Sequence, residues 1–444
     1  MSSHPAIYRQ ISKIARRNVL RNWRHSMATI LAITAGVAAI SLFDGFISSI
    51  RHQTDEGMMQ RAMLGDLIIQ QKGTQLSGYQ DIWKSSLDPK EQAFINGYLA
   101  QDKNVVHYVH FLSLIGVAEA GGQNSLVTGY GYDIKEGAAM RERFRWTAAA
   151  GVPLEEAKVP SIQLAIGLGR TLGCVSTYSG PEIVQLDGTI TAEERPFQCE
   201  SRNVVLNSST ESGQANSITL PVAGLFDVAI RELDRRSVNI DIASAKSLMD
   251  TERISNLTVT LVRPDQVADF IQRFQAAAKA QGFDFEVIPW TEHLLVAPVV
   301  QLTKIVKVFH MMFMIIVVLI GVMSIANTMM KSVNERIREI GTLRSLGFLR
   351  HHLILMFSLE GMYLSLMAST MGVIIAGIGS QFVGKLGYKI SGGILSSPIT
   401  VQVRAEPMAW LSISLLLIAL ATTTAFLASR RAAGMVIADA MRHV

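Results

Sequence analysis

The chain has 444 residues, of which 49% are hydrophobic and 17% charged. This balance is too apolar for an ordinary soluble protein and too polar for one wholly embedded in a membrane, so it predicts a few membrane spans and a large soluble domain. The net charge of +5 arises largely from Lys and Arg beside the apolar stretches. It therefore reports membrane orientation, and we expect no nucleic-acid partner.

The N-terminal segment, residues 1–26, contains several basic residues and no acidic residue. Ile7, Ile11 and Val19 fall on one face of a helix, and Arg9 lies with other basic residues on the opposite face. The pattern predicts a basic amphipathic helix at the cytosolic surface of a membrane, where anionic lipid head groups attract it.

Four apolar stretches are long enough to cross a membrane: residues 27–50, 301–330, 352–379 and 408–428. A short extracytoplasmic loop, residues 380–407, joins the last two. With four spans, the basic segments 1–26, 331–351 and 429–444 all lie on one side.

Because basic segments stay in the cytosol, both termini are expected there. The fold class predicted is an α-helical membrane protein with four transmembrane helices and a large mixed α+β extracytoplasmic domain between the first and second. This domain, residues 51–300, is expected to begin and end in helical stalks.

Within that domain, residues 105–120 and 124–130 are typical of a β-hairpin that turns at Gly121 and Gly122. Strand 257–262, helix 264–281 and strand 283–288 make the clearest strand-helix-strand unit. Residues 161–172 are predicted to be helical. Residues 175–216 are predicted to be an insertion or loop region, because Ser, Thr, Gly and Glu dominate them.

The only two cysteines of the chain, Cys174 and Cys199, both lie in the predicted outer domain. An oxidising compartment permits a disulfide bond between them. The alternative is two unrelated free thiols, and the spacing alone does not decide between the two.

A charged segment of about twenty residues, 331–351, links the second span to the third and predicts a tight cytosolic hairpin. On a helix, Glu335 and Glu339 share one face, and Arg336 and Ile340 share a neighbouring one. A glycine, Gly341, is expected to end this helix.

Gly347 is expected to close the hairpin. A short amphipathic helix of this kind can seat in a groove of a partner protein. The alternative is a solvated loop that only connects two spans.

One acid, Glu360, lies about seven residues into the third span, and a carboxylate there is costly unless it faces protein or water. It can be a gating or proton-linked group, or a structural acid that pairs with an arginine such as Arg344. We favour the structural acid.

No sequence pattern for catalysis is present: the chain has no G-x-x-x-x-G-K-[ST], H-E-x-x-H or C-x-x-C. We therefore expect no catalytic, cofactor-binding or metal-binding residue, and no enzyme activity of the chain by itself.

The segment N-T-M-M-K-S-V-N-E-R-I-R-E-I-G-T-L-R-S-L-G, residues 327–347, resembles the signature of the FtsX-like permease family, the MacB/Lol type of ABC transporter. The family pattern is approximately N-T-M-x-x-[SA]-V-x-E-R-x-R-E-I-G-x-L-[RK]-[AS]-L-G. The tail from Ser429 to His443 is similar to the family ending, although the usual Pro after the Arg pair is absent.

The resemblance implies a permease subunit in a bacterial inner membrane that transmits motion from a separate ABC ATPase, which would hold the ATP and Mg. A second permease subunit, identical or different, would complete the transporter. The implied ATPase-coupling residues are Glu335, Arg336, Glu339, Ile340, Gly341, Arg344 and Gly347.

The output implied is lipoprotein release, as in the LolC/LolE branch, or export of an outer-leaflet or periplasmic substrate, with a lipoprotein or periplasmic protein as partner. The alternatives are an FtsX-like signalling subunit that activates a cell-envelope enzyme and a membrane scaffold without an ATPase. A secondary transporter with Glu360 as its proton site is a further rival, but four spans without an inverted repeat disfavour it.

Overall fold

The computed structural model describes residues 4–21, 23–74, 83, 85–144, 146, 148–178, 193–228, 231–345, 347–390 and 399–432. The chain forms two compact units. The helical unit comprises Met1–Arg51, Thr303–Tyr388 and Val401–Val444, and the sheet unit comprises His52–Leu302 and Lys389–Thr400.

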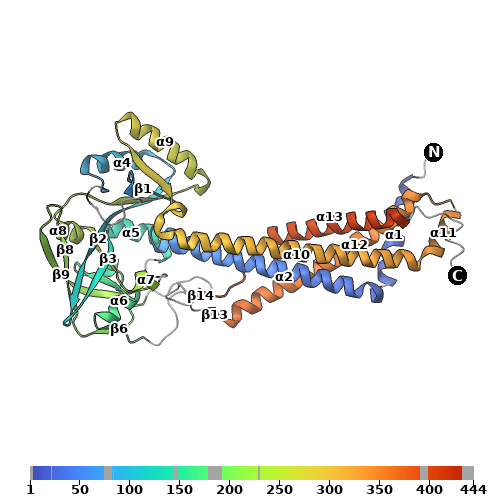
Figure 1. Cartoon of the computed structure of the whole chain (residues 1–444), viewed down its shortest axis with the longest axis horizontal. Coiled ribbons are helices and arrows are strands. Elements are labelled where there is room, and N and C mark those ends of the chain that lie inside the picture. Colours follow the sequence, from blue (N-terminus) through green and yellow to red (C-terminus); the bar gives the residue numbers. More distant parts are fainter. Residues whose placement is uncertain are drawn as a thin grey trace. The chain divides into compact units, whose positions relative to one another are not determined.

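The helical unit consists of long helices that run side by side and of shorter helices near one end of them (Figure 1). They are α1 (His4–Arg21), α2 (Trp23–Glu56), α10 (Ala297–Glu335), α11 (Ile337–Ser345), α12 (Arg350–Leu386) and α13 (Pro407–Ala432). Among the described residues, four helical stretches are long and apolar enough to cross a membrane: Ser26–Arg61, Ala297–Glu335, Arg350–Leu386 and Pro407–Arg430. The predicted fold class, with a mixed sheet domain between the first and second of them, is confirmed.

All four of these helices are longer than the apolar stretches that predicted them. Helix α2 runs to Glu56 and continues as a π-helix over Gly57–Arg61, and α10 already begins at Ala297. The 39 residues of α10 measure about 60 Å at the usual helical rise, against roughly 30 Å for a hydrocarbon core. It therefore extends well beyond a single bilayer crossing.

The apolar face of α1 packs against α12. Ile11 and Ala15 are 1% and 0% exposed and share a cluster with Leu353 and Phe357 of α12. The basic residues on the other side of α1 remain exposed. Burial against α12 explains why this segment keeps its apolar stripe.

The sheet unit contains one mixed ten-stranded sheet, with a main strand order of β12-β1-β11-β2-β3-β10-β5-β9-β4 and with β8 paired to β2 and β9. Its strands are β1 (Leu67–Gln71), β2 (Val105–Ala120), β3 (Gln123–Tyr132), β4 (Ala148–Gly151), β5 (Ile162–Ala165), β8 (Asn203–Ser209), β9 (Ala215–Phe226), β10 (Ser237–Asp241), β11 (Asn256–Leu261) and β12 (Phe285–Pro289).

The helices of this unit are α4 (Pro89–Gln101), α5 (Ile134–Arg141), α6 (Ile166–Thr171), α7 (Arg231–Asp234), α8 (Ile242–Met249) and α9 (Val267–Ala280). Of these, α6 and α8 contribute buried residues to one main apolar cluster, and α4 and α9 to the other. The β11-α9-β12 unit and the β2-β3 hairpin lie where the sequence predicts them.

Two other predictions for this unit were wrong. Residues 161–172 are not one helix: they form strand β5 and then α6. Every residue of β5 is buried between β10 and β9, and such a short continuous apolar run has no periodicity to separate strand from helix. Residues 175–216 contain strand β8 and the start of β9, although residues 179–192 lie outside the described residues.

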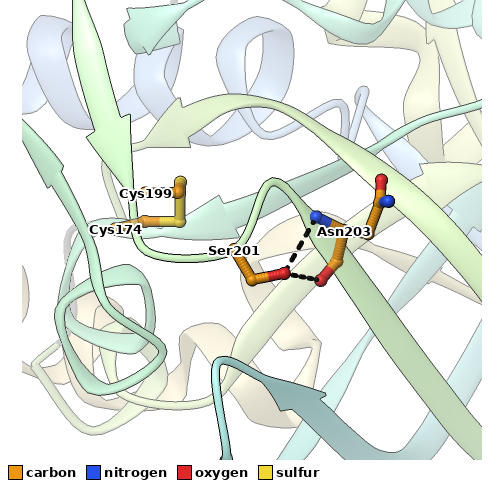
Figure 2. The surroundings of a disulfide bond; sticks show 4 residues. All are labelled: Cys174, Cys199, Ser201 and Asn203. Carbon is orange, nitrogen blue, oxygen red and sulfur yellow. Dashed lines mark hydrogen bonds between the residues drawn. A yellow bond between two sulfur atoms is a disulfide. The ribbon is translucent and has the colours of Figure 1, made fainter.

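The cysteines lie opposite each other in a small two-stranded sheet, β6 (Cys174–Ser176) and β7 (Phe197–Cys199), and form a disulfide bond (Figure 2). Next to it, the Ser201 hydroxyl donates to the carbonyl of Asn203 at 2.8 Å. The bond ties the end of α6 to the approach of β8.

Candidate coupling site

The hairpin between the second and third spans begins with a break in the helix at Arg336. Helix α10 ends at Glu335 and α11 starts at Ile337. The Arg336 N–H donates to the Val333 carbonyl at 3.1 Å, and the Ile340 N–H donates to the Arg336 carbonyl at 2.9 Å. Arg336 thus joins the two helices with both of its backbone groups hydrogen-bonded, and we call this residue the hinge.

Helix α11 ends at Ser345, beyond the glycine that was expected to stop it. Gly341 lies inside the helix and is buried, so that prediction was wrong. The end is marked by Gly347, whose φ of +92° lies in the region that glycine adopts without strain.

Two hydrogen bonds complete this helix end: Gly347 N–H to the Arg344 carbonyl at 3.1 Å, and Phe348 N–H to the Leu343 carbonyl at 3.0 Å. This is the pattern of a Schellman motif, which satisfies carbonyls that a helix end would leave unpaired.

The predicted coupling residues divide into an exposed group and a buried group. The Glu335 and Glu339 side chains are 49% and 61% exposed. Gly347 is also exposed, and Arg344 is half-buried.

The other three, Arg336, Ile340 and Gly341, are buried and face the helical unit, so they are not placed for direct contact with a partner. The prediction treated residues from 331 onward as one continuous helix, and the break at Arg336 changes which residues share a face.

Buried Glu360 of α12 is paired with Arg336 rather than with Arg344, the example that the sequence suggested. The Arg336 Nη1 lies 3.0 Å from Glu360 Oε1, and these side chains are 8% and 5% exposed. Asn18 of α1 donates to the same oxygen at 2.6 Å. One carboxylate oxygen thus joins three helical segments.

Sequence reasoning missed Asn18, although a signal was present. Asn18 follows Ile11 by seven residues and Ala15 by three, so helical spacing places it on the buried stripe of α1. A polar residue on a buried stripe needs a hydrogen-bonding partner, and Glu360 supplies it.

A separate buried polar group lies in the sheet unit. The Arg141 guanidinium contacts both the Tyr132 hydroxyl and the Glu155 carboxylate. Burial raises the pKa of Tyr132, so its phenol stays protonated. Arg141 and Glu155 are nearly fully buried as well, and the group holds α5 against β3 inside this unit.

Across the described part of the chain, no three His, Cys, Asp or Glu side chains are grouped to hold a metal ion. The feature of the helical unit that could act on another molecule is the exposed surface of the hairpin.

Comparison with known proteins bears on this hairpin directly. Residues 311–437 match the family model for the FtsX-like permease C-terminal region. An uncharacterised ABC transporter permease of Methanocaldococcus jannaschii is 24% identical over 170 residues, which is 38% of this chain and 43% of that protein. The match thus spans less than half of that relative.

Two solved structures are similar to this chain, both with low TM-scores. The periplasmic region of MacB from Actinobacillus actinomycetemcomitans is 13% identical and covers 50% of this chain and 87% of its own, with a TM-score of 0.32. The extracellular domain of YknZ, a noncanonic ABC-type transporter from Gram-positive bacteria, is 13% identical and covers 50% and 98%, with a TM-score of 0.29. TM-scores this low do not establish a shared fold. Residues 311–437, which include the hairpin, nevertheless match the FtsX-like permease family, the family that the sequence of the hairpin resembles.

Proposed function

We propose that this protein is the membrane subunit of an ABC transporter and carries motion from a separate ATPase to its sheet unit. The observation that carries the proposal is α11, a short helix set apart from α10 by the hinge at Arg336 and closed at Gly347. It presents Glu339 to solvent beside Glu335, the exposed last residue of α10, within a segment whose sequence resembles the family signature.

The helix that leads away from this site is suited to mechanical transmission. Helix α10 runs without a break from Ala297 to Glu335, and its proline, Pro298, lies in the first turn, where proline is tolerated. A displacement at the hairpin would therefore move the whole rod. The apolar side chains that α10 exposes would contact lipid or a second permease subunit, identical or different.

The energy source would be a partner chain, because this sequence contains no phosphate-binding loop. ATP and Mg would bind to the ATPase, and this chain would contribute the docking surface. Glu335, Glu339 and the half-buried Arg344 would face the ATPase groove, whereas Arg336 and Ile340 would hold the hairpin in place from inside.

The orientation proposed puts the hairpin and both termini in the cytosol and the sheet unit outside the inner membrane of a bacterium. The basic segments support this. The disulfide of the sheet unit supports it independently, because such bonds persist in oxidising compartments.

For the output, we propose lipoprotein release or export of an outer-leaflet or periplasmic substrate, with a lipoprotein or periplasmic protein as further partner. The support is the resemblance of the sequence to the MacB/Lol type together with a large domain between the first two spans.

The test is a charge reversal on the exposed face of α11. Glu339→Lys should fold and insert normally, because Lys and Glu have similar helix propensities. It should weaken ATPase docking by about 2–5 kcal/mol if the contact is well buried in the complex. Co-purification of the ATPase and ATP turnover measure the effect.

Glu232→Lys is the matched control, since it makes the same charge change on an acid that is 80% exposed in the sheet unit. It should leave both quantities unchanged. Full ATPase association and full ATP-driven activity in Glu339→Lys would show that α11 is not the docking element.

A further inference from the structure

The hinge of the hairpin is fixed from inside the helical unit. Arg336 is the residue between α10 and α11, yet its side chain is only 8% exposed and points to Glu360 of α12. Its weaker contact, 3.9 Å between Nε and Glu339 Oε2, lies toward the surface. The hinge and the exposed docking face are thus different parts of one hairpin.

Three helical segments meet at this point. Glu360 Oε1 accepts from Arg336 Nη1 at 3.0 Å and from Asn18 Nδ2 at 2.6 Å. The apolar cluster around them is drawn from the same segments: Ile11 and Ala15 of α1, Val333 and Ile340 on either side of the hinge, and Leu353 and Phe357 of α12.

A second bond joins α1 to α12 without involving the hinge. The Tyr363 hydroxyl, one turn along α12 from Glu360, lies 2.8 Å from the Ser12 hydroxyl. It offers a comparison, since it shares the two helices but does not hold Arg336.

Stability alone does not account for a buried ion pair here. Desolvating two charges costs as much as their attraction returns, and well-packed apolar replacements are often neutral or stabilising. An ion pair with a shared acceptor contributes specific geometry, because it fixes the position of the hinge relative to α1 and α12.

We propose that Glu360 is a positioning residue that makes α11, α1 and α12 move as one body. This inference rests on the proposed function. With the Asn18–Glu360–Arg336 clamp intact, a push on α11 reaches the membrane helices. Without it, the hairpin bends at Arg336 and the push is lost there, although the exposed acids still reach the ATPase.

The decisive variant removes both charges together. Arg336→Met with Glu360→Leu eliminates the clamp and leaves no unpaired buried charge. The Asn18 amide loses its acceptor, but Asn18 is only half-buried and can turn to water, so folding should be preserved. Glu360→Gln alone is less informative, because it leaves Arg336 buried without its counter-ion. Tyr363→Phe is the matched control, since it removes the bond to Ser12 and spares the hinge.

Rigidity is measured by electron-paramagnetic-resonance distances between spin labels at Ser345→Cys on α11 and Thr370→Cys on α12. Both positions are exposed, and the native cysteines are bonded to each other. In complexes with one labelled copy, the wild-type pair should give a narrow distribution that ATP does not change. The double variant should give a broad distribution that shifts with ATP, and Tyr363→Phe should behave as wild type.

The double variant should also keep the ATPase bound and its ATP turnover intact, while it loses ATP-driven transport. A narrow distribution in the double variant, equal broadening in Tyr363→Phe, or loss of the ATPase from the double variant would each overturn the proposal. If no ATPase binds even the wild type, the proposed function fails, yet the label distances without nucleotide still decide whether the clamp holds α11 rigid.

Discussion

Asp66, at the start of β1, is a buried acid whose surroundings disfavour its charge. The residue is 4% exposed, and its carboxylate accepts the Leu261 N–H at 2.7 Å. Burial raises the pKa of Asp66, and the Leu261 N–H opposes this in part. Its backbone N–H also donates to the Val259 carbonyl at 2.8 Å. Asp66 thus anchors β1 to β11 while its ionised form is penalised.

Asp66→Asn should therefore stabilise the sheet unit at neutral pH. The folded pKa lies above the unfolded value, so the contribution of this acid is fully present below the unfolded pKa and is lost as pH rises through the folded pKa. An amide carries no charge and its carbonyl can still accept the Leu261 N–H.

Hydrogen exchange of β1 and β11 in the intact protein measures the effect. Protection should exceed that of wild type at pH 7, and the difference should shrink as the pH is lowered toward the ordinary range for Asp. Weaker protection at pH 7, or an advantage that grows on acidification, would contradict this account.

At the residue scale, the sequence indicated which groups needed partners but not which partners they have. A carboxylate seven residues into a span needs a counter-ion or a polar partner, so the sequence alone predicts that Glu360 is paired. The choice between Arg336 and Arg344 depends on the break at Arg336, where the side chain turns toward α12. No sequence pattern within residues 331–351 predicts that break.

Among the elements, α12 is the helix whose glycines differ most in surroundings. A methyl group on Gly361 would lie 2.5 Å from the Cβ of Ala425 on α13, closer than such atoms approach without a shift. At Gly377, on the same helix, nothing lies within 4 Å of that position. The absence of a side chain at Gly361 therefore allows α12 and α13 to pack closely, whereas Gly377 lies in open space and has no such role.

Gly361→Ala should separate α12 from α13 and destabilise the helical unit by about 1–3 kcal/mol, as overpacking does. Gly377→Ala should be neutral or stabilising by up to about 1 kcal/mol, because alanine favours the helix. Unfolding of the detergent-solubilised protein, followed by circular dichroism, compares the two. Equal behaviour of both variants would show that this contact does not limit the packing.

Elements with a clear period were predicted well, and elements without one were not. The β11-α9-β12 unit alternates strand and helix patterns with turn residues between them, and the structure follows. All four residues of strand β5 are buried, so its apolar sequence has no alternation and fits a short piece of helix equally well. Helix α11 was predicted to stop at Gly341, but a buried glycine inside a packed helix does not act as a stop.

For the whole molecule, hydropathy and charge were enough to predict four spans and a domain between the first two. The strand order of the sheet could not be predicted from the sequence. Strand β10 runs parallel to β3, and β5 runs parallel to β9, across long stretches of intervening chain. Such pairings join segments that are far apart in the chain, and no single segment carries that information.

The orientation of the molecule yields the last prediction, which uses two introduced cysteines. Lys103→Cys lies on an exposed turn of the sheet unit, and Ser345→Cys lies on the exposed surface of α11. The native cysteines form a disulfide, so they should not react with a maleimide under oxidising conditions. A membrane-impermeant maleimide is applied to right-side-out and to inside-out vesicles.

Position 103 should be labelled only in right-side-out vesicles and position 345 only in inside-out vesicles, because basic segments beside membrane spans favour the cytosolic side. Labelling of both positions after detergent treatment is the control for reactivity. If position 345 reacted in right-side-out vesicles, α11 would lie on the wrong side of the membrane to meet an ATPase, and the proposed transmission from hairpin to sheet unit would fail with it.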